Sequence, residues 1–366
     1  MMKDRKERLK FSGGYGGLAV KLIIFIAAVF LLQRLVMPKY TGTVIEGNFT
    51  EEYYRDETPH ELLIIGNCES YENISPMKLW EEYGITSYIR GNSNQLIPQS
   101  YYILKEALKY ETPKAVLLNI QAMTVAEQSS EEYNRMVFDG MRLSREKIEG
   151  ILATKLSDEH LIEYLLPILR YKNRITNLEA DDFKYAFTKS PVKSYNGYYL
   201  RADVRAYDES SVPFERRLPD YSFSEKNMDY LERISELCRE KGIKLILMKA
   251  PSMYPVWVEP YEEQIKAFAD SQGLLYINTL NHMEEIGLDM DTDTYDEGLH
   301  LNVYGAEKVA SWLGEILVRE AELKDYRSDQ DISPVYEKRL EAYNSEKAEQ
   351  KAEFEETGYI SKYRNQ

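Results

Sequence analysis

The sequence is poor in cysteine, because Cys68 and Cys238 are the only two among 366 residues. Two cysteines are too few for a disulfide framework, and their spacing matches no metal-binding motif. They are either paired with each other or free, and the sequence leaves both alternatives open. The chain also lacks a Gly-rich phosphate loop, a zinc-type ligand cluster and a dinucleotide fingerprint. We therefore predict no cofactor and no metal site.

An excess of basic charge is also missing. The chain carries 46 Lys and Arg against 61 Asp and Glu, which gives a formal net charge of −15. Binding to nucleic acid requires concentrated Lys and Arg, so we do not expect a nucleic-acid partner. The length is sufficient for one large domain or two modest ones.

One long apolar segment lies near the N-terminus, from Leu18 to Met37. It is at the short end for a transmembrane helix, so a cleaved signal peptide is the alternative. The segment ends in Val36-Met37-Pro38-Lys39 and lacks a small-x-small cleavage site, which favours an uncleaved anchor. Five basic residues precede it and favour a cytoplasmic N-terminus: Lys3, Arg5, Lys6, Arg8 and Lys10.

We therefore predict a cytoplasmic basic segment over residues 1–17, a single transmembrane helix over 18–37 and a linker over 38–57. The rest of the chain, after Tyr40, is then expected on the outer side of the cell membrane.

From residue 58 to about 323 short apolar strands alternate with amphipathic helices. This alternation predicts a parallel, doubly wound α/β sheet, in which reactive groups lie beyond the carboxyl ends of the strands. The predicted strands cover residues 62–65, 86–89, 115–118, 244–248 and 274–277. The predicted helices cover residues 76–83, 101–110, 223–241, 261–272 and 303–318.

Two segments depart from this alternation. Residues from about 125 to 223 carry helical pieces without a clear period, and we interpret them as an inserted, mainly helical cap. Residues 324–366 are dominated by Glu, Lys, Arg and Tyr with few aliphatic side chains. We expect this tail to be a solvated helix or a loosely ordered segment.

Two polar segments lie at the ends of predicted strands and helices, where catalytic side chains are expected. Cys68 follows the first buried strand, and His300 precedes the last helix. A nucleophile at a strand–helix turn lies beside amides that favour an anion, and a histidine from the far end of the chain can act as its base. Asp296 and Glu297 are close enough in sequence to orient that histidine.

These segments resemble those of a known family. Gly66-Asn67-Cys68 and Glu297-Gly298-Leu299-His300-Leu301-Asn302 are similar to the nucleophile and Asp-x-x-His blocks of the SGNH, or GDSL-type, hydrolase superfamily. Gly91-Asn92-Ser93-Asn94-Gln95 resembles its glycine block. Residues 79–85 and 249–252 resemble a bacterial, membrane-anchored branch whose relatives help to acylate cell-wall or secreted polysaccharides. The resemblance covers most of residues 58–320.

The resemblance implies a flavodoxin-like three-layer fold and an esterase or O-acyltransferase. It implies Cys68 as nucleophile, His300 as base and Glu297 or Asp296 as the orienting carboxylate. It also implies an oxyanion and substrate site with Gly91, Asn92, Gln95 and, as a looser match, Asn119. The partners implied are a membrane-bound O-acyltransferase and a glycan acceptor, with acetyl as the acyl group by analogy.

The chain departs from the family at two positions, because the family has Ser where Cys68 stands and Asp where Glu297 stands. Loss of catalysis would also produce such changes. The alternative function is therefore an inactive scaffold or glycan-binding component of a polysaccharide assembly complex. For Cys68 itself the alternatives are inert packing or a disulfide with Cys238.

Overall fold

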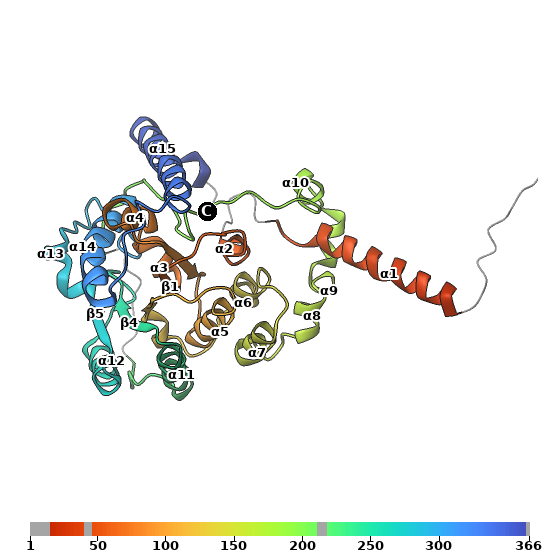
Figure 1. The fold of residues 1–366 in the computed structure, drawn as a ribbon, viewed down its shortest axis with the longest axis horizontal. Coiled ribbons are helices and arrows are strands. Elements are labelled where there is room, and N and C mark those ends of the chain that lie inside the picture. The colour runs from red at the N-terminus through yellow and green to blue at the C-terminus, as the bar shows by residue number, and fades with distance from the viewer. Residues whose placement is uncertain (1–14, 40–45, 211–217, 364–366) are drawn as a thin grey trace, which may run out of the picture. The chain divides into compact units, whose positions relative to one another are not determined.

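The computed structural model describes residues 15–39, 46–210 and 218–363 of the chain. The chain divides into two compact units (Figure 1). One consists of Met1–Thr41 with Ile162–Pro191, and the other of Gly42–Leu161 with Val192–Gln366. The second unit contains the sheet and every residue predicted for the site.

The larger unit is built on a five-stranded sheet with the order β2-β1-β3-β4-β5, and every pair in it is parallel. This confirms the predicted α/β class and the parallel sheet. Membership of the SGNH fold stays a prediction. The strands are β1 (Leu62–Gly66), β2 (Ser87–Gly91), β3 (Ala115–Asn119), β4 (Lys244–Lys249) and β5 (Leu275–Asn278).

Helices cover both faces of the sheet because alternate strand residues point to opposite sides. Leu62 and Ile64 belong to a core that also contains residues of α4 (Pro76–Tyr83), α14 (Val303–Ala321) and α15 (Ser333–Thr357). Leu63 and Ile65 belong to a second core with residues of α5 (Ile97–Ala107), α11 (Glu225–Lys241) and α12 (Glu259–Gln272). Strands buried on both faces explain the wholly apolar runs in the sequence.

Local signals in the sequence set several helix ends. Ser75 accepts a hydrogen bond from the backbone of Lys78 and caps α4, and Gly84 ends this helix in the left-handed conformation. Ser224 and Gly242 do the same for α11. These caps explain why both helices lie within a few residues of their predicted ranges.

The segment predicted as a cap is divided between the two units. Helices α6 (Glu131–Phe138) and α7 (Arg145–Thr154) belong to the larger unit, where they contact α2 (Glu46–Tyr53) and α5, respectively. Further along, Asn196 accepts a hydrogen bond from the backbone of Ile89, so the chain lines the edge of β2 there. Residues 162–191 belong instead to the unit that contains the apolar helix. A single helical cap stays a prediction.

The C-terminal tail forms α15, which is packed through tyrosines. Tyr336 and Tyr343 are buried, and the Tyr336 ring lies 4.5 Å from that of Trp80. Tyr343 accepts a hydrogen bond from Ser75 at 3.0 Å. The tail therefore contributes tyrosines to the core of the larger unit, instead of being wholly solvated or loosely ordered as expected. The sequence did not indicate this because the tail has few aliphatic residues.

The smaller unit contains α1 (Tyr15–Val36), α9 (Ile168–Tyr171), the 3₁₀ helix η2 (Lys172–Thr176) and α10 (Ala180–Lys184). Among the described residues, α1 is the one helix long and apolar enough to cross a membrane, a property that a signal sequence shares. Helix α8 (Leu161–Leu165) lies at the boundary of the two units.

Candidate active site

Cys68 is the first residue of α3 (Cys68–Asn73) and follows directly on β1. The side chain of Asn67 caps this short helix by accepting a hydrogen bond from the amide of Glu69 at 3.3 Å. Cys68 is half-buried and carries a free thiol. Cys238 is also free, and it is a residue of α11 whose side chain is buried in the core. The structure therefore does not join the two cysteines.

His300 lies in the loop that precedes α14, and this loop is held by its own hydrogen bonds. The hydroxyl of Thr294 donates to the carbonyl of His300 at 2.7 Å and accepts from the amide of Gly298 at 2.8 Å. The amide of Leu301 donates to the side chain of Asn73 at 2.8 Å, which ties the loop to α3. The loop therefore fixes His300 against the helix that begins at Cys68.

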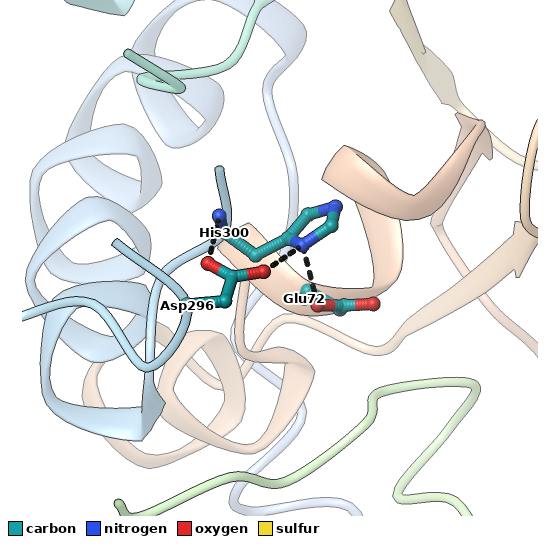
Figure 2. Close-up of side chains that lie close together, drawn as sticks. All are labelled: Glu72, Asp296 and His300. Carbon is teal, nitrogen blue, oxygen red and sulfur yellow. Dashed lines mark hydrogen bonds and ion pairs between the residues drawn. The ribbon is translucent and has the colours of Figure 1, made fainter. Parts of the chain in front are cut away.

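Asp296 is the carboxylate that orients His300 (Figure 2). Its Oδ2 atom lies 2.7 Å from the Nδ1 nitrogen of His300, and its Oδ1 accepts the backbone amide of His300 at 2.8 Å. Glu297, which stands three residues before the histidine as the family's Asp does, pairs with Arg205 at 2.7 Å. Of the two carboxylates left open by the sequence, only Asp296 contacts the ring in the described structure.

Glu72 is a second carboxylate at the same nitrogen, and the sequence analysis missed it. Its Oε2 atom lies 3.2 Å from Nδ1 of His300, and it also accepts a hydrogen bond from the hydroxyl of Tyr295. Tyr295 stacks on the imidazole ring, with 6.1 Å between ring centroids. The signal was present in the spacing, because residues i and i+4 of a helix share a face, and Glu72 follows Cys68 by four.

These neighbours determine the charge of His300. Burial alone would lower the pKa of His300, but the charges of Glu72 and Cys68 and the hydrogen bond to Asp296 outweigh it and raise this pKa well above its usual value. These neighbours therefore favour the protonated form of the imidazole.

Both carboxylates contact Nδ1 and leave the other ring nitrogen of His300, Nε2, without a carboxylate partner. Figure 2 shows Nε2 on the side of the ring away from both carboxylates. Within the described part of the chain it is buried and has no hydrogen-bond partner. Cys68 acts electrostatically on the same ring. The structure thus brings together Cys68, His300 and Asp296, three of the four residues predicted for catalysis.

A buried ion pair involves Glu69, the residue that follows Cys68 in the sequence. The ammonium group of Lys249, at the end of β4, is 0% exposed and donates to both carboxylate oxygens of Glu69 at 3.0 and 3.2 Å. Burial lowers the pKa of Lys249, against the opposing effect of Glu69. Asn119 donates to Glu69 at 3.1 Å and accepts from the amide of Gln121 at 2.9 Å, so its side chain supports this ion pair.

Gly91, Asn92 and Gln95, which were predicted for the oxyanion and substrate site, lie at the end of β2 and in the loop that follows it. Gly91 packs against the turn that carries Cys68, and Asn92 and Gln95 bond within their own loop. Gly91 pairs with Gly66 across the sheet, and a Cβ atom at Gly91 would lie 3.2 Å from the carbonyl oxygen of Gly66. This close approach favours glycine. The buried amide of Asn92 donates to Gln95 at 3.0 Å and to Thr50 at 3.3 Å. Gln95 in turn donates to the carbonyl of Arg90 and the hydroxyl of Ser100, so both amides hold the loop.

Glu72, Asp296 and His300 also form a group whose ligand atoms lie within 4.8 Å of one another, as a metal site requires. The contacts between the carboxylates and Nδ1 have hydrogen-bond lengths of 2.7 and 3.2 Å. In the described structure the three side chains form a charge-assisted hydrogen-bonded cluster around one imidazole.

No family model matches the chain, and no curated protein matches it.

Proposed function

We propose that this chain is a membrane-anchored acyl esterase or O-acyltransferase of the SGNH type that acts on an extracytoplasmic glycan, with Cys68 as nucleophile. The observation that carries the proposal is the placement of the free thiol beside a buried histidine that Asp296 orients. Two residues 232 positions apart in sequence and paired in this way match the nucleophile and base of acyl transfer.

The raised pKa of His300 suits a cysteine better than a serine. A protonated imidazole stabilises a neighbouring thiolate, which is itself the attacking species. A serine hydroxyl needs a neutral imidazole to take its proton. In the proposal, protonated His300 faces Cys68 and is held by the carboxylates of Asp296 and Glu72 on the far side of its ring.

The proposed reaction proceeds in two halves. In the first, the Cys68 thiolate attacks the carbonyl carbon of an acyl ester, and His300 gives its proton to the departing alcohol. In the second, neutral His300 takes a proton from water or a glycan hydroxyl, which attacks the thioester and releases Cys68 as thiolate. The backbone amides of Cys68 and Gly91 are the proposed oxyanion donors.

The proposed location and partners follow from α1 and from the resemblance. As a single-pass anchor with a cytoplasmic N-terminus, α1 holds the larger unit on the outer side of the membrane. The proposed acyl donor comes through a membrane-bound O-acyltransferase, and the acceptor is a cell-wall or secreted polysaccharide.

The proposal is tested with the full-length protein in detergent and p-nitrophenyl acetate. Nitrophenol release is followed, and intact mass is measured for an added acetyl group. The wild type is compared with Cys68→Ala and His300→Ala, and Cys238→Ala is the matched control because this thiol lies in the core. We expect an acetyl adduct that requires Cys68, turnover that requires His300, and no change in the control.

An adduct that persists in Cys68→Ala would refute the assignment of the nucleophile. Equal turnover in all four proteins, without an adduct, would favour the inactive scaffold or glycan-binding component that the sequence left as the alternative.

A further inference from the structure

The smaller unit exposes many large apolar side chains outside α1. We call residues 162–191 the collar segment. Phe183 and Phe187 are 57% and 65% exposed. Scattered single apolar residues are normal on a surface, but a concentration within so short a segment marks an interaction site. The exposed large apolar residues of the collar segment are Ile162, Leu166, Leu169, Ile175, Phe183 and Phe187.

The collar segment is bonded to the C-terminal end of α1. Arg174 donates to the carbonyl of Val36 at 2.7 Å and to both oxygens of buried Asp182 at 3.0 Å. Arg34 donates to the carbonyl of Ala186. Helix α1 contacts α9, η2 and α10, which lie beside this end of it (Figure 1). These contacts hold the collar segment beside the C-terminal end of α1.

This attachment places the exposed phenylalanines at the end of the apolar helix. Phe183 follows Asp182 directly, and Phe187 follows Ala186. If α1 spans the bilayer, its last residues lie at the lipid headgroups, where Arg and Lys side chains gather at helix ends. Phenylalanines held at that level by short hydrogen bonds face lipid rather than bulk water.

The charge of the collar segment fits the same surface. It contains five basic and four acidic residues, whereas the whole chain carries −15. Anionic headgroups repel acidic protein surface and attract basic side chains. The collar segment is therefore repelled less by a bacterial-type anionic bilayer than the rest of the chain.

We propose that the collar segment is an interfacial membrane element, which inserts the apolar side chains of its short helices among the headgroups around the end of α1. Its partner is the lipid surface. The proposal rests on the membrane anchor proposed above and is independent of the chemistry at Cys68. Such an element would attach the chain to the bilayer at a second place and restrict the tilt of α1.

The test uses a tryptophan reporter in the full-length protein, reconstituted in phosphatidylcholine–phosphatidylglycerol vesicles with or without brominated lipids. Phe187→Trp is compared with the wild type, whose three tryptophans supply the background. Val318→Trp is the matched control, because Val318 is exposed (38%) on α14 of the larger unit. Flotation of each protein with the vesicles is measured alongside.

We expect brominated lipids to remove about half or more of the emission added by Phe187→Trp, and to leave that added by Val318→Trp nearly unchanged. Flotation without quenching at Phe187→Trp would overturn the interfacial role and leave the anchor intact. Equal quenching at both positions would also overturn it, because contact would then not be particular to the collar segment. Loss of flotation in all proteins would refute the anchor and the interfacial role together.

Discussion

At the scale of single residues, His300 has two carboxylates, those of Asp296 and Glu72, at the Nδ1 side of its ring. The charge of Cys68 also raises the pKa of His300. The carboxylate of Asp296 contacts both the backbone amide and the ring nitrogen Nδ1 of His300, and so fixes the ring. Glu72 adds a second negative charge from the helix that Cys68 begins. Orientation and charge of the imidazole are thus supplied by different residues and can be tested separately.

Asp296→Asn is expected to lower kcat for ester turnover by about 10²–10⁴, because an amide cannot hold a protonated Nδ1 in the same way. Glu297→Gln is the matched control and is expected to leave kcat within about twofold, since Glu297 pairs with partly exposed Arg205. Steady-state kinetics with p-nitrophenyl acetate measures both. Equal losses in the two variants would contradict the assignment of Asp296.

Glu72→Gln is expected to move the pKa of His300 down toward its usual value, because it removes one of the charges that raise it. Titration of the histidine ring by NMR measures this shift. The variant His282→Gln removes the signal of another, partly exposed histidine and so helps to assign the signal of His300. The rate of Cys68 alkylation should also fall near neutral pH in Glu72→Gln. An unchanged titration would show that Glu72 does not act on the ring.

The same shift predicts a pH dependence of stability. A histidine with a higher pKa in the folded than in the unfolded state binds its proton more tightly when folded. Its contribution is fully present below the unfolded value of about 6.5 and is lost as pH rises through the folded value. The free energy of unfolding of the wild type, relative to His300→Gln, should therefore fall as pH rises above about 6.5. A difference that grows over this range would contradict the raised pKa.

At the scale of elements, the end of β4 and the start of α3 meet through the buried pair of Lys249 and Glu69. Lys249→Met should lower the free energy of unfolding by about 3–5 kcal/mol, because it leaves a buried carboxylate without its partner. Adding Glu69→Gln should restore much of this loss. Chemical denaturation followed by tryptophan fluorescence measures both, and Lys78→Met, on an exposed pair, should cost about 0–1 kcal/mol. A double variant no more stable than Lys249→Met would contradict this account.

Helix α15 should stabilise the larger unit through its tyrosines rather than through its charged surface. Tyr336→Ala is expected to cost about 3–5 kcal/mol in the free energy of unfolding, because it empties the space against Trp80. Tyr359→Ala removes an exposed ring and should cost less than about 1 kcal/mol. Similar costs for both would mean that α15 is not part of the core.

At the scale of the whole molecule, the orientation across the membrane can be tested with introduced cysteines. In a background without Cys68 and Cys238, we expect a membrane-impermeant maleimide to label exposed Leu143→Cys in intact cells. Lys3→Cys should react only after permeabilisation, because the proposed topology keeps the basic N-terminal flank in the cytoplasm. The reverse pattern would invert the proposed topology.

The sequence by itself determined the α/β class, the five strands, the ends of helices α4 and α11, and the apolar N-terminal helix. These features depend on local periodicity, capping residues and the length of apolar runs, which are read directly from neighbouring residues. Cys68 and His300 were selected as candidates for the same reason, since each adjoins an element whose end the sequence marks.

The tertiary structure decided which side chains meet. The positive φ angles at Glu297 and Gly298 belong to a loop that directs Asp296 to the ring and leaves Glu297 with Arg205. Glu72 reaches His300 only because α3 packs against that loop. The tertiary structure also decided that tyrosines of α15 are buried and which partners Asn92 and Asn119 bind. Such contacts join residues far apart in the chain, and local patterns show only which residues share a helix face, as Cys68 and Glu72 do.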